Sequence, residues 1–180
     1  HSILSYLSDP PRDASDRTLW MTVLASRQVG KSLTCVFGGY CLAAYSPGFD
    51  YVTIADTDKR AEYLLQRVHH LHERMPPELR TDTVLYRESR QLTFDRLQGG
   101  KMRLMSAREA AAGVGQSIDV FHASEVAFWN DFAQTMTLIY PVFRNRKNAY
   151  VIFECTPLEA GSDWHDHYQS AALGRGRHFA

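Results

Sequence analysis

The chain has 180 residues, a length that is typical of one domain with a substantial core. Its 20 lysines and arginines balance its 20 aspartates and glutamates, and this formal net charge of zero excludes a strongly basic, dedicated nucleic-acid-binding module. A hydrophobic content of 44%, with no apolar stretch long enough to cross a bilayer and no recognisable signal peptide, is that of an ordinary soluble globular protein.

The first residues are polar and lead into a short apolar segment. Residues 9–13 are Asp-Pro-Pro-Arg-Asp, which predicts a loop. Residues 20–24 have the β-branched and aromatic content of a buried strand. Because His1 is an unusual natural start, we expect a piece of a longer protein, in which residues 1–19 lead into one domain of residues 20–175.

A tight loop connects this strand to residues 33–45, which are mostly apolar, free of proline and predicted to be helical. The loop consists of Ala25, Ser26, Arg27, Gln28, Val29, Gly30, Lys31 and Ser32. A strand, a loop and Gly-Lys-Ser at the start of a helix form the Walker A pattern, whose backbone N–H groups surround a β-phosphate. Its lysine reaches the β- and γ-phosphate oxygens and its hydroxyl binds Mg²⁺, roles that Lys31 and Ser32 fit. Ala25 departs from the pattern, which usually begins with glycine, and a chance Gly-Lys-Ser is the alternative.

A second motif favours the nucleotide site over that alternative. Residues 118–125 predict an apolar strand that ends in the carboxylate of Glu125. In ATPases of this class such a strand, the Walker B motif, neighbours the phosphate-binding loop, and its carboxylate holds Mg²⁺ through water and orients the attacking water. An aspartate usually precedes the glutamate, but here Ser124 does, so we expect Ser124 to bind a Mg²⁺-bound water and Glu125 to carry most of the function. A helix cap formed by Ser124 is the less favoured alternative.

Between the motifs the sequence predicts a strand, a helix and three short strands. Residues 51–55 predict a buried strand, and Asp56 and Thr57 predict the cap of a helix that runs to about Arg74. The apolar face of this helix consists of Ala61, Leu64, Leu65, Val68 and Leu71. Its histidines, His69, His70 and His72, are expected on a solvated face rather than in a zinc site. Residues 83–86, 91–94 and 101–105 predict an antiparallel meander beside the main sheet, and residues 106–117 predict a mobile loop.

The last third of the chain predicts another helix and another buried strand. Residues 130–140 are expected to form a helix that stops near Pro141, and residues 149–155 a strand. For the basic residues 144–148 a solvated turn is favoured over a DNA contact. His165 and His167 are two residues apart and are therefore expected to be surface residues rather than metal ligands.

The cysteines argue against disulfides. Cys35 and Cys41 are six residues apart on a predicted helix, so they lie on roughly opposite sides and out of bridging reach. With Cys155 at the end of a strand, we expect all three to be reduced core residues in an intracellular setting.

Three stretches together carry a resemblance to a known family. They are Ser-Arg-Gln-Val-Gly-Lys-Ser (26–32), Ser-Glu-Val-Ala-Phe-Trp (124–129), and Glu-Cys-Thr-Pro (154–157) followed by Trp-His-Asp-His-Tyr (164–168). This set resembles the ATPase domain of the large terminase subunits of tailed bacteriophages, from residue 20 to about residue 173. The resemblance implies an α/β P-loop NTPase fold, a three-layer sandwich with a central, mostly parallel sheet flanked by helices and a small antiparallel extension.

The resemblance also implies a function and partners. ATP, with Mg²⁺, would power the translocation of double-stranded DNA into a procapsid in the host cytoplasm, without a membrane. The partners implied are DNA, a homo-oligomeric ring of this subunit on the capsid portal, and the small terminase subunit. The nuclease domain that normally follows in the family lies beyond these residues, so no DNA cleavage is expected of them.

Three further residues receive roles through the resemblance. Thr156 takes the place of a strand-end hydroxyl that binds near the nucleotide and couples its state to movement. Arg27, inside the loop, is expected to pair with the γ-phosphate or to bridge to a carboxylate. Residues 110–115 contain no arginine where many relatives carry a catalytic one, so Arg108 is the nearest candidate to act across a subunit interface, and a solvated Arg108 is the alternative.

Without the resemblance, the residues alone indicate an ATPase that uses Lys31, Ser32 and Glu125. A helicase- or recombinase-like DNA-dependent ATPase with the same core remains an alternative. So does a non-hydrolysing nucleotide-binding or DNA-binding assembly module.

Overall fold

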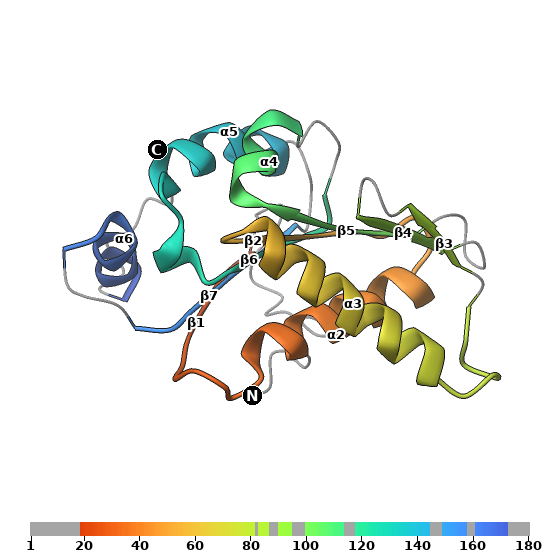
Figure 1. The fold of residues 1–180 in the computed structure, drawn as a ribbon. Helices are drawn as coiled ribbons and strands as arrows, with labels where there is room; N and C mark the ends of the chain where they lie inside the picture. The colour runs from red at the N-terminus through yellow and green to blue at the C-terminus, as the bar shows by residue number, and fades with distance from the viewer. Residues whose placement is uncertain are drawn as a thin grey trace.

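One seven-stranded sheet crosses the molecule and separates two layers of helices (Figure 1). The computed structural model describes residues 19–81, 83–86, 90–94, 100–113, 118–144, 149–157 and 161–172. The strand order is β1 (Leu19–Leu24), β7 (Tyr150–Cys155), β6 (Val120–Ser124), β2 (Asp50–Ala55), β5 (Gly100–Ser106), β4 (Gln91–Phe94) and β3 (Thr83–Tyr86). From β1 to β5 neighbouring strands pair in parallel, whereas β4 and β3 extend the sheet in antiparallel pairs. The predicted α/β fold with a small antiparallel extension is confirmed, except that β5 of the meander belongs to the parallel sheet itself.

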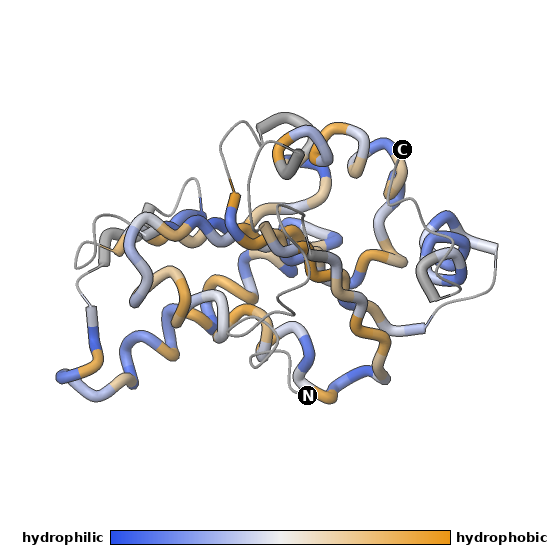
Figure 2. The backbone as a smooth tube through the Cα atoms, turned by 180° about the vertical axis from the view of Figure 1, so that it is seen from behind, coloured by the Kyte–Doolittle hydropathy of each residue, from blue (hydrophilic) through white to orange (hydrophobic). Residues whose placement is uncertain are grey.

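Helices cover both faces of this sheet (Figure 1). On one face lie α2 (Lys31–Tyr45) and α3 (Asp58–Arg74), and on the other lie α4 (Ala107–Gly113) and α5 (Phe132–Arg144). A 3₁₀ turn, η1 (Val126–Phe128), follows β6 and packs against β7 and α6 (Asp163–Ala172). Along the helices the chain alternates between hydrophilic and hydrophobic residues, as expected where one side of a helix packs on a sheet (Figure 2). No helix in the described ranges is long and apolar enough to cross a membrane.

The central strands are buried on both faces because their side chains enter two separate cores. In β2, Tyr51 and Ala55 pack in the core under α2 and α3, while Val52 and Ile54 pack in the core under α4 and α5. Strands with both faces covered are nearly continuous apolar runs. This is why the sequence predicts β2, β6 and β7 well, whereas β1, also predicted to be buried, is the edge strand of the sheet and exposes Leu24.

Helix α2 approaches β2 very closely at Gly39. A Cβ atom at this position would lie 2.3 Å from the Tyr51 ring, and the Tyr51 hydroxyl donates a hydrogen bond of 2.8 Å to the Cys35 carbonyl of the same helix. The contact fixes the helix over the strand, so that the loop preceding α2 is held at the carboxyl edge of the sheet. The same helix buries Cys35 but exposes Cys41, which corrects the expectation that all three cysteines are core residues.

Helix α3 begins and packs as predicted. The Thr57 side chain accepts a hydrogen bond from the Arg60 N–H, and the apolar face is buried except for Leu71, which is partly buried. One histidine differs from the prediction, because Nδ1 of His72 lies 2.8 Å from the Tyr40 hydroxyl. Burial, with the nearby Arg80 charge, lowers the pKa of His72, so this histidine packs against α2 rather than lying on a solvated face.

The segment predicted as a mobile loop contains helix α4. Ser106 and Glu109 form a reciprocal cap, in which the Glu109 carboxylate accepts the Ser106 N–H at 2.9 Å and the Ser106 hydroxyl accepts the Glu109 N–H at 3.4 Å. Arg90, from the turn before β4, bonds both Glu109 and Asp58 at the start of α3. The loop prediction is therefore wrong for residues 107–113, and residues 114–117 lie outside the described part.

Two predictions near the C-terminal end also need correction. Pro141 lies inside α5 rather than ending it. Proline has no N–H to donate to the Thr137 carbonyl one turn earlier, but both residues are exposed, so water can bond to that carbonyl instead. His167 is half-buried rather than fully exposed, because the centre of its ring lies 5.4 Å from that of Phe153 and 5.7 Å from that of Phe132. Of the basic turn, Arg144 ends α5 and residues 145–148 lie outside the described ranges.

Candidate active site

The loop between β1 and α2 forms the centre of the candidate site. It turns on two residues with left-handed backbone, Gln28 at φ 64° and Gly30 at φ 81°, and Gly30 caps α2. Ala25 is not among the residues with positive φ, and its N–H donates to the Cys155 carbonyl at 3.2 Å, which continues the β1–β7 pairing. The loop therefore needs no glycine at position 25, which explains the departure from the usual motif.

Lys31 brings together residues from all three sequence motifs. Its ammonium group, Nζ, donates to Oε1 of Glu125 at 2.8 Å and to Oγ1 of Thr156 at 3.0 Å, and it lies 3.5 Å from Oε2 of Glu154. All four residues are buried. Strand β7 lies between β1 and β6, so β6, the strand predicted to end in Glu125, does not pair with β1. The carboxyl end of β6 nevertheless lies close to the loop that follows β1.

Glu125 is held in place from both sides. Its backbone is left-handed, at φ 52°, an uncommon conformation for a residue with a side chain. Its Oε2 accepts the Thr156 N–H at 3.0 Å, and the Thr156 hydroxyl lies 3.3 Å from Oε1. Thr156 thus touches both the lysine of the loop and the carboxylate of the second motif.

Beneath these residues lies a line of polar side chains on the α2 side of the sheet. The Ser124 hydroxyl bonds to Oε1 of Glu154 and lies 3.4 Å from the Ser32 hydroxyl, while Nε2 of His122 lies 3.7 Å from the same Glu154 oxygen. Burial alone would raise the pKa of Glu154, but the neighbouring His122 ring and the hydrogen bond from Ser124 lower it to about 2. Burial alone would lower the pKa of His122, but Cys35 and Glu154 raise it to about 9. The line therefore brings a basic and an acidic side chain, His122 and Glu154, within 3.7 Å of each other in the protein interior.

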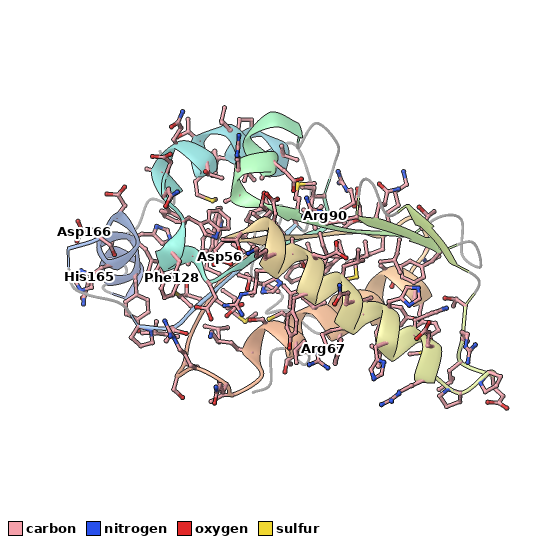
Figure 3. The ribbon with its side chains drawn as sticks, in the orientation of Figure 1. Asp56, Arg67, Arg90, Phe128, His165 and Asp166 are labelled. Atoms are coloured by element: carbon pink, nitrogen blue, oxygen red, sulfur yellow. The ribbon has the colours of Figure 1, made fainter. Side chains whose placement is uncertain are left out.

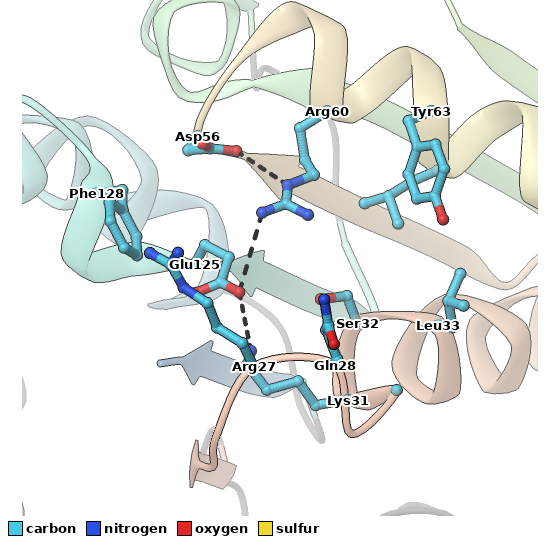
Figure 4. Close-up of a pocket in the computed structure, with 12 residues that line it drawn as sticks. Arg27, Gln28, Lys31, Ser32, Leu33, Asp56, Arg60, Tyr63, Glu125 and Phe128 are labelled. Carbon is cyan, nitrogen blue, oxygen red and sulfur yellow. Dashed lines mark hydrogen bonds and ion pairs between the residues drawn. The ribbon is translucent and has the colours of Figure 1, made fainter. Parts of the chain in front are cut away.

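A pocket of about 510 Å³ opens between the loop and α3 (Figure 4). Arg60 points into it, with Nη2 4.0 Å from Oε1 of Glu125 and Nε 3.6 Å from Oδ1 of Asp56. Neither Arg60 nor Asp56 was expected at the site. Asp56 could have been, because it directly follows β2 at the edge where the loop lies, whereas Arg60 lies on the first turn of α3, whose orientation the sequence does not give.

The two arginines predicted as catalytic lie in different places. Arg27 lines the pocket, with its guanidinium carbon 5.5 Å from the centre of the Phe128 ring, on the side of the pocket opposite Tyr63 (Figure 4). Arg108 is exposed on the first turn of α4 and lines a second pocket of about 370 Å³. Asp56 lines both pockets, and Figure 3 shows Asp56 and Phe128 at the same end of the sheet. Arg108 is thus near the site but not part of the pocket that the loop borders.

The oxygen atoms at the loop fit a magnesium ion. Ser32, Ser124 and Glu125 offer hydroxyl and carboxylate oxygens, and Mg²⁺ prefers oxygen ligands, of which proteins often supply only one or two beside phosphates and water. Within the described part of the chain, no group of three or more His, Cys, Asp or Glu side chains is arranged to hold a metal. The donor set therefore fits an ion that arrives with a phosphate ligand.

The strand order, the loop and the converging motifs define an α/β fold of the P-loop NTPase class. No protein-family model and no curated protein matches the chain. Among solved structures, the Thermus phage P74-26 large terminase ATPase domain matches with a TM-score of 0.65 at 23% identity, over 92% of this chain and 67% of that chain.

The large terminase of a thermophilic bacteriophage gives similar matches. Its complex with ATP-gamma-S matches with a TM-score of 0.70 at 13% identity, and its complex with ADP with 0.66 at 14%. These matches cover 96% of this chain but 41% and 42% of the other, so the chain spans less than half of that protein. Similarity at these identities establishes the fold, which is that of terminase ATPase domains.

Proposed function

We propose that this chain is the ATPase domain of a phage large terminase, and that it hydrolyses ATP to move double-stranded DNA into a procapsid. The observation that carries the proposal is the convergence of Glu125 and Thr156 on Lys31, within 3.0 Å of its Nζ. Phosphoryl transfer needs a cationic clamp and an oriented water rather than a covalent nucleophile, and this constellation offers both. The ATP-gamma-S and ADP in structures of similar fold support a nucleotide as the ligand.

Binding of the triphosphate would begin at the N-terminus of α2. The first N–H groups of a helix have no partner within it, and those of α2 open toward the loop, where an anion would accept them. The Lys31 ammonium would then exchange Glu125 for phosphate oxygens. This exchange would free the Glu125 carboxylate to orient and deprotonate the attacking water.

The remaining predicted residues would complete the site. Ser32, Ser124 and Glu125 would hold Mg²⁺, which when bound neutralises charge on the β- and γ-phosphate oxygens. Thr156 accepts a hydrogen bond from Lys31 and donates one to Glu125, so any change in the Lys31–Glu125 pair would move Thr156 and the segment after β7. Arg27 would contact the γ-phosphate, and Arg108 would reach a neighbouring subunit of a ring.

In this proposal the chain works in the host cytoplasm as part of a homo-oligomeric ring on the capsid portal, with DNA and the small terminase subunit as partners. The test is phosphate release from ATP by the 180-residue chain, with and without double-stranded or single-stranded DNA. We expect stimulation by double-stranded DNA. Stimulation by single-stranded DNA alone would favour a helicase-like ATPase, and nucleotide binding without turnover would favour a non-hydrolysing module.

A further inference from the structure

A buried carboxylate lies one strand away from the place where an acidic residue is expected. Ser124 of β6 pairs in register with Glu154 of β7, and the two side chains are hydrogen-bonded. Glu154 is 0% exposed, and its second oxygen, Oε2, has no hydrogen-bond partner among the described residues, although it lies 3.5 Å from Lys31 Nζ. The acidic group missing from position 124 is thus present at the neighbouring strand end.

The contacts of Glu154 define the direction of a short hydrogen-bond relay. The Ser124 hydroxyl donates its single proton to Oε1 of Glu154. The Ser32 hydroxyl, 3.4 Å away, can then only donate to the Ser124 oxygen, whose proton is already used. With its proton so placed, the Ser32 oxygen keeps its lone pairs free for another ligand.

A buried histidine lies beside Glu154 deep in the sheet. His122, two residues before Ser124, is also 0% exposed, and its Nε2 lies 3.7 Å from Oε1 of Glu154. On its other side, Nδ1 of His122 lies 3.3 Å from the Thr53 hydroxyl of β2. Such a buried pair contributes little net stability compared with well-packed apolar side chains, so a stabilising role alone accounts poorly for it.

We propose that Glu154 is a positioning residue for divalent-cation binding: it ends the relay that leaves the Ser32 lone pairs free, and it supplies the negative charge that Ser124 lacks. The inference rests on the proposed function, since the cation would arrive with a nucleotide. Glu154 itself acts through Ser124 and Ser32. A role limited to anchoring Lys31 would instead affect nucleotide binding with and without the cation.

The test measures how strongly Mg²⁺ and ADP assist each other's binding. Isothermal titration of the 180-residue chain with ADP, in excess Mg²⁺ and in EDTA, gives two dissociation constants whose ratio is this coupling. We expect Glu154→Gln to reduce the ratio about tenfold, which is the effect of losing one charge-assisted hydrogen bond. The dissociation constant for ADP in EDTA should change little. Adding Ser124→Asp to this variant returns an acid beside Ser32 and should restore much of the ratio.

A matched control removes a different buried acid. Asp50 pairs with Arg103 at 2.8 Å at the opposite end of the sheet, so Asp50→Asn should lower the melting temperature but leave the ratio unchanged. Should Glu154→Gln fail to fold, Glu154→Asp keeps the carboxylate but withdraws it from the Ser124 hydroxyl, and the ratio should fall there too.

Three results are distinguishable. An unchanged ratio in a folded Glu154→Gln, or in a folded Glu154→Asp, overturns the inference. An equal loss of ADP affinity in both buffers also overturns it, because Glu154 would then act through Lys31 or the loop. If the unaltered chain binds no ADP in either buffer, the proposed function itself fails.

Discussion

At the scale of single residues, Lys31 holds the site in a resting arrangement. Two of the three N–H donors of its ammonium are used, by the buried carboxylate of Glu125 at 2.8 Å and by the Thr156 hydroxyl at 3.0 Å, so at most one remains for a phosphate oxygen. A nucleotide must therefore compete with Glu125 for Lys31. This competition ties the arrival of the phosphate to the release of the proposed base.

Replacing Lys31 should remove both its pairing with Glu125 and the positive charge that would bind phosphate. We expect Lys31→Ala to abolish ATP turnover and to weaken nucleotide binding, because no cation then faces the β- and γ-phosphate oxygens. Phosphate release and nucleotide titration measure the two effects. Lys59→Ala, an exposed lysine on the first turn of α3, is the control. Normal turnover in Lys31→Ala would show that the loop does not act on phosphate.

Glu125→Gln should separate binding from chemistry. An amide cannot take a proton from water, so we expect ATP to bind while hydrolysis falls by about 10² to 10⁴, the usual contribution of a general base. Single-turnover phosphate release measures this, with the exposed Glu62→Gln on α3 as the control. If hydrolysis survives, the base lies elsewhere, and Glu154 is the next carboxylate to examine.

Arg27 should not be replaceable by lysine. Its planar guanidinium lies over Phe128 at 5.5 Å, a contact that an ammonium group makes less well and that holds the side chain at the pocket. We expect Arg27→Lys to lower kcat about tenfold with a smaller effect on KM. Arg67→Lys is a matched control, because Arg67 makes the same kind of contact with Tyr63 but does not itself line the pocket. Equal kinetics in the two variants would assign Arg27 a structural role.

At the scale of elements, the structure shows which signals in the sequence are local and which are not. Buried strands and the cap of α3 follow from composition and periodicity. Helix α4 was not predicted, because the alanines and glycines of this segment suggested a loop. Its start could have been predicted, since Ser106-Ala-Arg-Glu109 is a capping-box sequence. The continuation of α5 past Pro141 depends on solvent exposure, which the sequence does not display.

Gly39 offers a test of how tightly α2 is fixed over β2. Helix propensity alone would make alanine more stable than glycine by about 1 kcal/mol. A Cβ at 2.3 Å from the Tyr51 ring opposes this, and we expect Gly39→Ala to destabilise the fold by about 1–3 kcal/mol, as overpacking does. Urea denaturation measures the change in the free energy of unfolding. An increase in stability would mean that Tyr51 moves aside without cost.

At the scale of the whole molecule, the parallel sheet brings site residues that are far apart in the sequence to one edge. Glu125 and Thr156 could be placed beside Lys31 because each directly follows a predicted strand, and the carboxyl ends of parallel strands share an edge. Arg60 could not be predicted in this way, since its approach to Glu125 depends on how α3 turns over the sheet. The same holds for the pairing of His122 with Glu154, which depends on the register between β6 and β7.

The same geometry bears on how neighbouring subunits would cooperate. Arg108 is exposed and lines a pocket other than that of the loop, on a short helix whose first turn is fixed by the Ser106–Glu109 cap and by Arg90. A side chain so placed does not line the pocket of its own loop. In the proposed ring it would instead act on the phosphates of a neighbour, where an arginine can accelerate hydrolysis by about 10³ or more.

Mixing two inactive variants tests action across the interface. Subunits with Arg108→Ala keep an intact loop, and subunits with Lys31→Ala keep the arginine, so each alone should be nearly inactive in the assembled ring. In a mixture, some interfaces combine an intact Lys31 with an intact Arg108, and ATP turnover should partly return. Turnover measured against the mixing ratio should therefore pass through a maximum. A flat, inactive profile would place the action of Arg108 within one subunit, and a fully active Arg108→Ala ring would remove this residue from the mechanism.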